Sequence, residues 1–315
     1  MKKFLVIILI SISFFILNSC SDTLNPYAPF RERYVLSGII RSDTTLQVVT
    51  LTRSYRPSGL DPIADTENVS VIGAEVNVWY NDTLYVMRDS SIARTDTSRY
   101  KTNVNFYYCN NLKPAPNSYV EIQALLPNGL LLTSITKMPD AGYGFFDQAS
   151  NNTFDPTLNS QIYVGWKDLG NVYYEPRISI IYYQKGDTNP KNFYIPLSYF
   201  NQNGKLTPNY PQLTKINFFT IDYSTLNEAM TELSGTDKNK SDFTISKIIV
   251  DVIAYDENLS TYYSSLQQSV DGFTVNLDAA DYSNITGGFG IFGSYYKASF
   301  RIDLVRSYIN SFGYN

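Results

Sequence analysis

Short stretches in which apolar and polar residues alternate dominate the first half of the chain. In residues 74–80 every second side chain is apolar, which is the period by which a β-strand presents one face to a core. Segments rich in β-branched residues predict further strands at 34–40 and 47–53. Asn81-Asp82 predicts a tight turn into another strand at 83–87.

The clearest hairpin joins two expected strands at residues 119–126 and 130–136. Its connection contains Asn128-Gly129, a pair that readily takes the positive φ that a hairpin turn requires. Two polar, turn-rich segments, residues 56–70 and 89–99, are expected to be long surface loops. Together these elements predict a small antiparallel β-sandwich.

A cluster of Pro and Gly at residues 138–142 indicates a boundary directly after this hairpin. We therefore expect a first β module over residues 34–139 and a second β-rich domain over 140–315. Because its Gly-Ala-x-Val strand lies at residues 73–76, the first module resembles the immunoglobulin-like or transthyretin-like sandwiches of secreted bacterial proteins. Such modules are usually spacers or binding platforms.

The second region mixes strands with two short helices. Strands are expected at 161–167, 177–184 and 192–197. Residues 243–255 form the most strand-like segment, apolar on nearly both faces, which predicts a central strand. Asp251 interrupts this segment and should therefore have a structural partner.

The two helices are indicated by capping residues and by apolar positions at helical spacing. Thr225 with Glu228 fits a capping box, and Gly235 can end that first helix. Asp256 can cap a second helix, whose apolar stripe extends from Leu259. Apolar and aromatic stripes of this kind usually face a protein core.

The N-terminus has the pattern of a secretory signal peptide over residues 1–19. Lys2 and Lys3 precede an apolar run that ends at Leu17. This run is shorter than the roughly 17 to 25 residues that a membrane-spanning helix needs, so we expect no retained span.

The signal peptide ends in Leu17-Asn18-Ser19-Cys20, which resembles a bacterial lipobox. The resemblance implies that Cys20 is lipidated and becomes the N-terminus of the mature chain. Acyl chains contribute about 0.8 kcal/mol per buried methylene, so several of them anchor a protein durably. Residues 20–33 then form a lipidated tether, which can hold the folded part clear of the headgroups.

Composition excludes several classes of function. The chain is mildly acidic, with a formal net charge of −4 and no Lys/Arg cluster, so nucleic acid is not an expected partner. It contains no histidine, which removes the commonest general base, the commonest zinc ligand and every Ser-His-Asp arrangement. We expect no cofactor, no metal and no enzymatic activity.

Carboxylate-pair catalysis, as in glycosidases, needs only two Asp or Glu side chains, so the absence of histidine does not exclude it. The candidate carboxylates are Asp140, Asp147, Asp155, Asp251 and Asp256. Nothing in the sequence singles out a pair, so a carboxylate-dependent glycoside hydrolase is kept as an alternative. The remaining cysteine, Cys109, is expected to be a small residue in a strand or at its end.

A glycine motif, G-x-G-x-x-G, is formed by Gly288, Gly290 and Gly293. In dinucleotide-binding folds this spacing joins a strand to a helix whose N-terminus meets the pyrophosphate. Here the residues that follow are aromatic and β-branched, and 22 residues remain after Gly293, too few for the βαβ unit. We therefore expect these glycines to permit a bulge or close backbone packing.

Several motifs together resemble one family. These are the lipobox, Trp166-Lys167-Asp168 followed by Tyr173-Tyr174, the Asp-x-x-Leu-x-x-Tyr-Tyr segment at 256–263, and Asn-Ile-x-Gly-Gly-x-Gly-Ile-Phe-Gly at 284–293. They are similar to those of the bacterial lipoprotein family labelled domain of unknown function DUF4249. The resemblance implies an outer-membrane lipoprotein encoded near a TonB-dependent transporter. It does not decide whether the protein faces the cell surface or the periplasm.

Tyrosine is unusually abundant, with 27 residues beside 18 Phe, and its rigid ring with a hydroxyl suits a wet binding surface. We therefore expect an accessory binding protein for nutrient uptake, with a glycan or peptide as ligand. The tentative ligand contacts are Trp166, Tyr173 and Tyr174. The alternative is a structural or adhesive envelope lipoprotein without a small ligand.

Overall fold

The computed structural model of the chain describes residues 30–56, 66, 68–98, 100–140, 153–158, 160–267 and 282–315. The expected signal peptide, the lipidation site Cys20 and the tether as far as residue 29 lie outside these residues. The regular structure is mainly β, as the sequence predicts. No helix within the described ranges has both the length and the apolar character to cross a bilayer.

The strands described in the first half of the chain pair around one core. They are β1 (Tyr34–Arg41), β2 (Gln47–Arg53), β3 (Glu75–Tyr80), β4 (Thr83–Ile92), β5 (Val104–Cys109), β6 (Tyr119–Leu125) and β7 (Leu131–Lys137). The strands expected at 34–40, 47–53, 74–80, 119–126 and 130–136 are confirmed to within one residue at each end. Asn81 and Asp82 both have positive φ, 47° and 58°, as the two central residues of a type I′ hairpin turn require.

The prediction of a surface loop at residues 89–99 was wrong for its first four residues. The polar segment beginning at Asp89 continues β4 as far as Ile92, and it pairs with β5, which the sequence analysis did not identify. Side chains of this half-strand face solvent, while its cross-strand hydrogen bonds come from the backbone. Polar residues therefore do not end the strand. Cys109 ends β5 and is buried.

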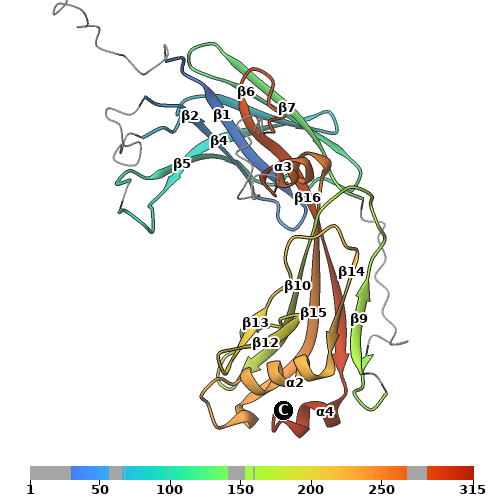
Figure 1. The fold of residues 1–315 in the computed structure, drawn as a ribbon. Helices are drawn as coiled ribbons and strands as arrows, with labels where there is room; N and C mark the ends of the chain where they lie inside the picture. Colours follow the sequence, from blue (N-terminus) through green and yellow to red (C-terminus); the bar gives the residue numbers. More distant parts are fainter. Residues whose placement is uncertain are drawn as a thin grey trace, which may run out of the picture.

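The strand order in this first part is β1-β2-β5-β4-β3-β6-β7. β4 pairs with β3 through its first half and with β5 through its second half, so it connects two layers (Figure 1). Leu36, Val78, Ile122 and Leu132 are fully buried between them. The arrangement is consistent with the expected β-sandwich.

The second half contains strands and three helices among its described residues. They are β8 (Thr153–Phe154), β9 (Gln161–Gly165), β10 (Tyr174–Gln184), β11 (Lys191–Tyr194), β12 (Ser198–Gln202), β13 (Lys205–Asn209), β14 (Phe218–Asp222), α2 (Tyr223–Glu232), a 3₁₀ turn η2 (Lys240–Asp242), β15 (Phe243–Tyr255), α3 (Glu257–Gln267), β16 (Phe289–Leu304) and α4 (Arg306–Ser311). The three longest strands described are β10, β15 and β16. The strands β8, β12, β13 and β14 and the helix α4 were not expected.

β16 joins the two halves into one twelve-stranded sheet. Its first part pairs in parallel with β1, from Phe289 to Tyr295, and its later part pairs antiparallel with β15, from Tyr295 to Ile302. In Figure 1 it runs from the upper sandwich down to the lower part. The expected division at residues 139 and 140 places β16 wholly in the second domain, whereas Ile285 and Phe292 pack in the first core.

The structure confirms one helix start and corrects the other. Asp256 caps α3, because the Leu259 N–H donates to its Oδ1 at 2.9 Å. α2 begins at Tyr223, directly after β14, and Thr225 is a buried residue inside the helix instead of its cap. Local capping chemistry was misleading here because the preceding strand delivers the chain straight into the helix, with Asp222 at the cap position and no side-chain cap bond.

β15 is the central strand expected from residues 243–255, with β10 on one side and β16 on the other. Asp251 has the structural partners that its position required. The Ser299 hydroxyl donates to its Oδ1 at 2.5 Å, and the Lys297 ammonium lies 2.9 Å from its Oδ2.

The glycine motif lies where β16 begins, and no helix follows it. Gly290 has φ of +115°, and a Cβ there would lie 2.0 Å from the carbonyl oxygen of Leu36 in β1. A Cβ at Gly293 would lie 2.4 Å from Leu259 of α3. The expectation of close backbone packing is confirmed, because these glycines let β16 pack against β1 and α3.

Candidate functional site

The three expected ligand contacts are parts of hydrophobic cores. Trp166 and Tyr174 are fully buried, with their rings edge-on at 5.4 Å. Tyr173 is 6% exposed, and the Lys215 ammonium lies 4.9 Å from its ring centroid. Since a ligand could reach Trp166 or Tyr174 only if the core opened, the structure does not support them as contacts. Burial of this kind depends on long-range packing, which a local motif does not report.

The candidate carboxylates are divided by the fold. Asp155 accepts hydrogen bonds from Thr157 in its own loop, and Asp147 lies outside the described residues. Asp140 and Asp256 do line one hollow of about 410 Å³ between the two halves of the molecule. Asp256 is 4% exposed there and caps α3, so its role in the fold is structural.

No cluster of three or more His, Cys, Asp or Glu side chains suited to a metal ion occurs in the described part of the chain. Cys109 is buried, and burial raises the pKa of its thiol to about 11. A protonated, enclosed thiol is unreactive.

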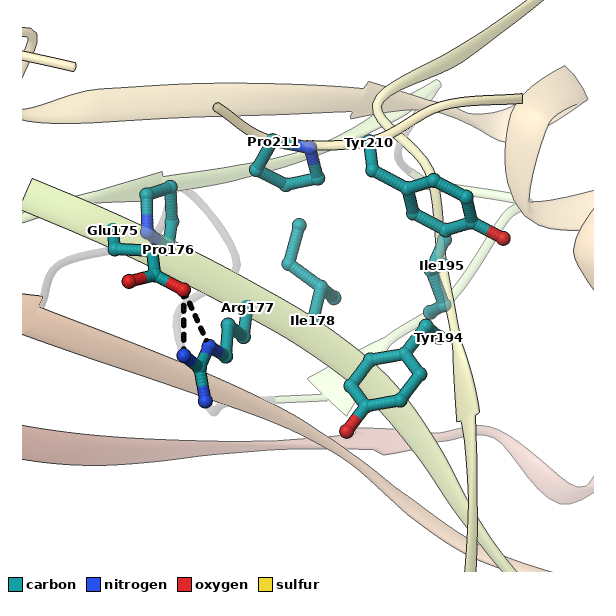
Figure 2. Close-up of a pocket in the computed structure, with 8 residues that line it drawn as sticks. All are labelled: Glu175, Pro176, Arg177, Ile178, Tyr194, Ile195, Tyr210 and Pro211. Atoms are coloured by element: carbon teal, nitrogen blue, oxygen red, sulfur yellow. Dashed lines mark hydrogen bonds and ion pairs between the residues drawn. The ribbon is translucent and has the colours of Figure 1, made fainter. Parts of the chain in front are cut away.

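A pocket of about 320 Å³ opens at the edge of the large sheet, within the size range of small-ligand sites. Its lining residues come from β10, from the end of β11 and from the segment after β13: Glu175, Pro176, Arg177, Ile178, Tyr194, Ile195, Tyr210 and Pro211 (Figure 2). We call it the edge pocket. None of these residues was singled out by the sequence analysis.

The edge pocket exists because the strand ladder along the outer side of β10 is interrupted. At one end of the gap, β11 leaves β10 after a last hydrogen bond from the Ile195 N–H to the Ile178 carbonyl, 2.9 Å. At the other end, Thr214 and Tyr174 exchange two backbone hydrogen bonds of 2.7 and 2.9 Å. Between these ends, no strand pairs with the outer side of β10 among the residues described.

The alternation of a strand decides which backbone groups face this gap. Tyr174 and Ile178 use their outward side for the bonds at its two ends, so Pro176 between them also points outward. Proline lacks an N–H and is tolerated in a strand where no ladder bond is needed. This explains why β10 begins at Tyr174, three residues before the expected start at Arg177.

Two exposed aromatic rings flank the edge pocket. Tyr194 is 54% exposed and Tyr210 is 43% exposed, whereas Ile178 and Ile195 form an almost fully buried apolar floor. Figure 2 shows the two rings on the side of Ile178 opposite Glu175. An apolar floor with tyrosines at its rim combines van der Waals contact with hydroxyl hydrogen bonding.

A charged pair completes the lining. Arg177 Nη2 lies 2.6 Å from Glu175 Oε1, and the buried Tyr255 hydroxyl donates to Glu175 Oε2 at 2.5 Å. Burial opposes the charged form of Arg177, but its bonds to Glu175 outweigh this, so its pKa is raised. Burial and the bond to Glu175 raise the pKa of Tyr255. Near neutral pH, Arg177 is therefore positively charged and Tyr255 is neutral.

The fold and the edge pocket define a two-part, mainly β protein with an open, tyrosine-rimmed hollow on the edge of its large sheet. The chain belongs to the DUF4249 family, a domain of unknown function, which it matches over residues 22–301. The match includes both halves and the glycine motif. A search of curated proteins found no match to this chain.

Proposed function

We propose that this protein is a non-enzymatic, lipid-anchored binding protein of the outer membrane that captures its ligand in the edge pocket, beside a TonB-dependent transporter. The observation that carries the proposal is that two exposed tyrosines, Tyr194 and Tyr210, lie at the rim of the edge pocket, which has an apolar floor. Most large apolar side chains in a folded protein are covered, and exposed tyrosines beside a pocket are typical of binding surfaces.

The lipid anchor rests on the sequence around Cys20. A signal peptide that ends in a lipobox predicts export and acylation. The tether would then hold the folded part away from the membrane, where the edge pocket is accessible to a soluble ligand or a transporter. Replacing Cys20 with Ala should release the chain from the membrane fraction. Retention of the variant in that fraction would contradict the lipid anchor.

Capture in the edge pocket is tested with the full mature chain on arrays of glycans and linear peptides. The double change Tyr194→Ala and Tyr210→Ala should weaken binding of any specific ligand by roughly tenfold or more, since each buried aromatic contact contributes about 1 kcal/mol. Tyr119→Ala is the matched control, because Tyr119 is 59% exposed on β6, in the other half of the molecule. Equal losses in both variants would refute the edge pocket as the site.

Partnership with a transporter is tested by gentle affinity purification from the native membrane. Recovery of a TonB-dependent transporter in stoichiometric amounts supports the proposal. Labelling of intact cells with a membrane-impermeant biotin reagent decides the orientation, since protection of the chain would contradict display at the cell surface.

A structural or adhesive role is the second candidate, and exposed apolar side chains on β6 and β7 favour it. Leu125, Leu131 and Ile135 are 43%, 48% and 47% exposed, and Leu125 lies opposite Leu131 in the pairing of β6 with β7. Apolar side chains gathered in this way are typical of a docking surface. Binding to a partner protein that is lost on Leu131→Ser with Ile135→Ser, but kept after the change of Tyr194 and Tyr210, would favour this role.

A further inference from the structure

Two backbone groups of β10 in the edge pocket have no backbone partner in the part of the chain that the structure describes. Ile178 accepts a hydrogen bond through its carbonyl, but within the described ranges its N–H meets no backbone acceptor, although the residue is 1% exposed. The outward carbonyl of Pro176 likewise receives no backbone N–H there. Buried amide groups of folded proteins are nearly always paired, so an outward donor and acceptor at the floor of a pocket indicate a missing partner.

The arrangement of these two groups is that of a strand edge. In a parallel pair, one residue of the incoming segment donates its N–H to one carbonyl and accepts from the N–H two residues further along. Pro176 and Ile178 offer this combination. An antiparallel segment meets the same two groups with the residues on either side of the one opposite Arg177. In both directions, the complementary ligand is an extended backbone.

The side chains around the gap alternate as a strand requires. Pro176, Ile178 and Ile195 are buried on the core side of the sheet, while Arg177 and Tyr194 lie on the exposed side. A short strand in the gap would therefore place the side chain opposite Arg177 on the exposed side, beside the guanidinium, and the side chains of its two neighbours on the apolar floor.

We propose that the ligand of the edge pocket is an extended peptide, which adds a short strand along the outer side of β10, in the gap between Ile195 and Thr214. The inference rests on the proposed function, because it names the class of ligand for the same site. Strand addition to an exposed sheet edge is a general mode of peptide recognition, in which main-chain bonds provide affinity and side-chain pockets provide selectivity.

The test uses the full mature chain and a displayed library of linear hexapeptides, with a glycan array alongside. Each peptide that binds is resynthesised with one backbone nitrogen methylated at a time. Methylation of the amide that meets the Pro176 carbonyl should weaken binding by about tenfold. Methylation of the next amide along should leave the affinity within about twofold, since alternate amides face away from β10.

Amide hydrogen exchange provides an independent reading. Addition of a binding peptide should slow exchange of the Ile178 amide by at least about tenfold. The Arg177 amide is the internal control, because it points toward β15 and is already paired. Its rate should not change.

The outcomes separate the two proposals. Strand addition is overturned if methylation of the peptide, at any amide, leaves its affinity unchanged. It is also overturned if a bound peptide leaves the exchange rate of the Ile178 amide unchanged. Glycans that bind in a manner dependent on Tyr194 and Tyr210, with no peptide binding, also overturn it but preserve capture in the edge pocket. Ligands that bind equally well after both tyrosines are replaced overturn the proposed function itself.

Discussion

A buried carboxyl at the junction of the two halves makes the stability of this protein depend on pH. Asp256 is 4% exposed, and its Oδ2 contacts the Thr136 hydroxyl of β7 at 2.5 Å. Thr136 Oγ1 also lies 2.8 Å from Ser294 Oγ of β16, which lies 3.1 Å from the Lys137 carbonyl. Three contacts therefore link α3, β7 and β16.

The number of hydrogens favours a protonated Asp256. The hydroxyls of Thr136 and Ser294 supply two hydrogens for three contacts, so one contact lacks a donor when the carboxylate is charged. Thr136 donates to Asp256 when the carboxylate is charged. When Asp256 is protonated this bond reverses, so that Asp256 donates to Thr136, Thr136 donates to Ser294, and Ser294 donates to the Lys137 carbonyl. All three contacts are then hydrogen bonds.

The magnitude follows from the pKa. Burial raises the pKa of Asp256 from its ordinary value of 3.8 to about 6, against the opposing effects of the Thr136 hydroxyl and the Leu259 N–H. Because the folded protein binds this proton more tightly than the unfolded chain does, its contribution to stability is present below pH 4 and is lost as pH rises to about 6. The loss amounts to about 3 kcal/mol, at about 1.4 kcal/mol per pKa unit.

Asp256→Asn is the decisive perturbation. The Asn Oδ1 can still cap α3 by accepting from the Leu259 N–H, and its Nδ2 supplies the missing donor to Thr136. We expect the free energy of unfolding of the variant, minus that of the natural chain, to rise by about 3 kcal/mol between pH 4 and pH 7. The measurement is urea unfolding followed by circular dichroism across this range.

The difference between the two chains is the relevant quantity, because other carboxyls titrate as well. Asp43 and Asp187, for example, have lowered pKa values and contribute in the opposite direction at lower pH. These contributions are the same in both chains and cancel. A difference that stays flat from pH 4 to pH 7, or a variant less stable than the natural chain at pH 7, would refute the reasoning.

Three further predictions follow from the packing. Gly290→Ala should cost at least about 3 kcal/mol in denaturant unfolding, since its Cβ would meet Leu36 O at 2.0 Å, whereas Gly129→Ala, with φ of +85° and open space around it, should cost about 1 to 2 kcal/mol; equal costs would contradict the close approach. Trp166→Ala should cost about 3 to 5 kcal/mol, so any loss of ligand binding must be compared with the thermal stability of the variant; a stability change below about 1 kcal/mol would contradict the burial of this ring. Maleimide at pH 7 should leave Cys109 unmodified until the chain is denatured, as mass spectrometry of its peptide would report; rapid labelling of the folded chain would contradict burial of the thiol.

Local signals predicted much of the fold. The period-two alternation of residues 74–80 and the Asn128-Gly129 turn both depend on chain neighbours alone, and the strands at those positions are confirmed. Asp256 also acts as its sequence suggests, because an N-cap needs only the next three residues. β5 was missed, although its sequence from Val104 to Cys109 is apolar and aromatic; a count of β-forming residues would have found it.

The sequence by itself determined the mainly β class, most of the strands of the first half and the family, because each of these is encoded in short, contiguous patterns. The tertiary structure decided which aromatics are buried and where a pocket opens. Trp166 lies in the core although its motif suggested a binding residue. The edge pocket arises where β11 leaves β10 and Thr214 returns to it. Pairings between distant segments create such a gap, and no local periodicity encodes them.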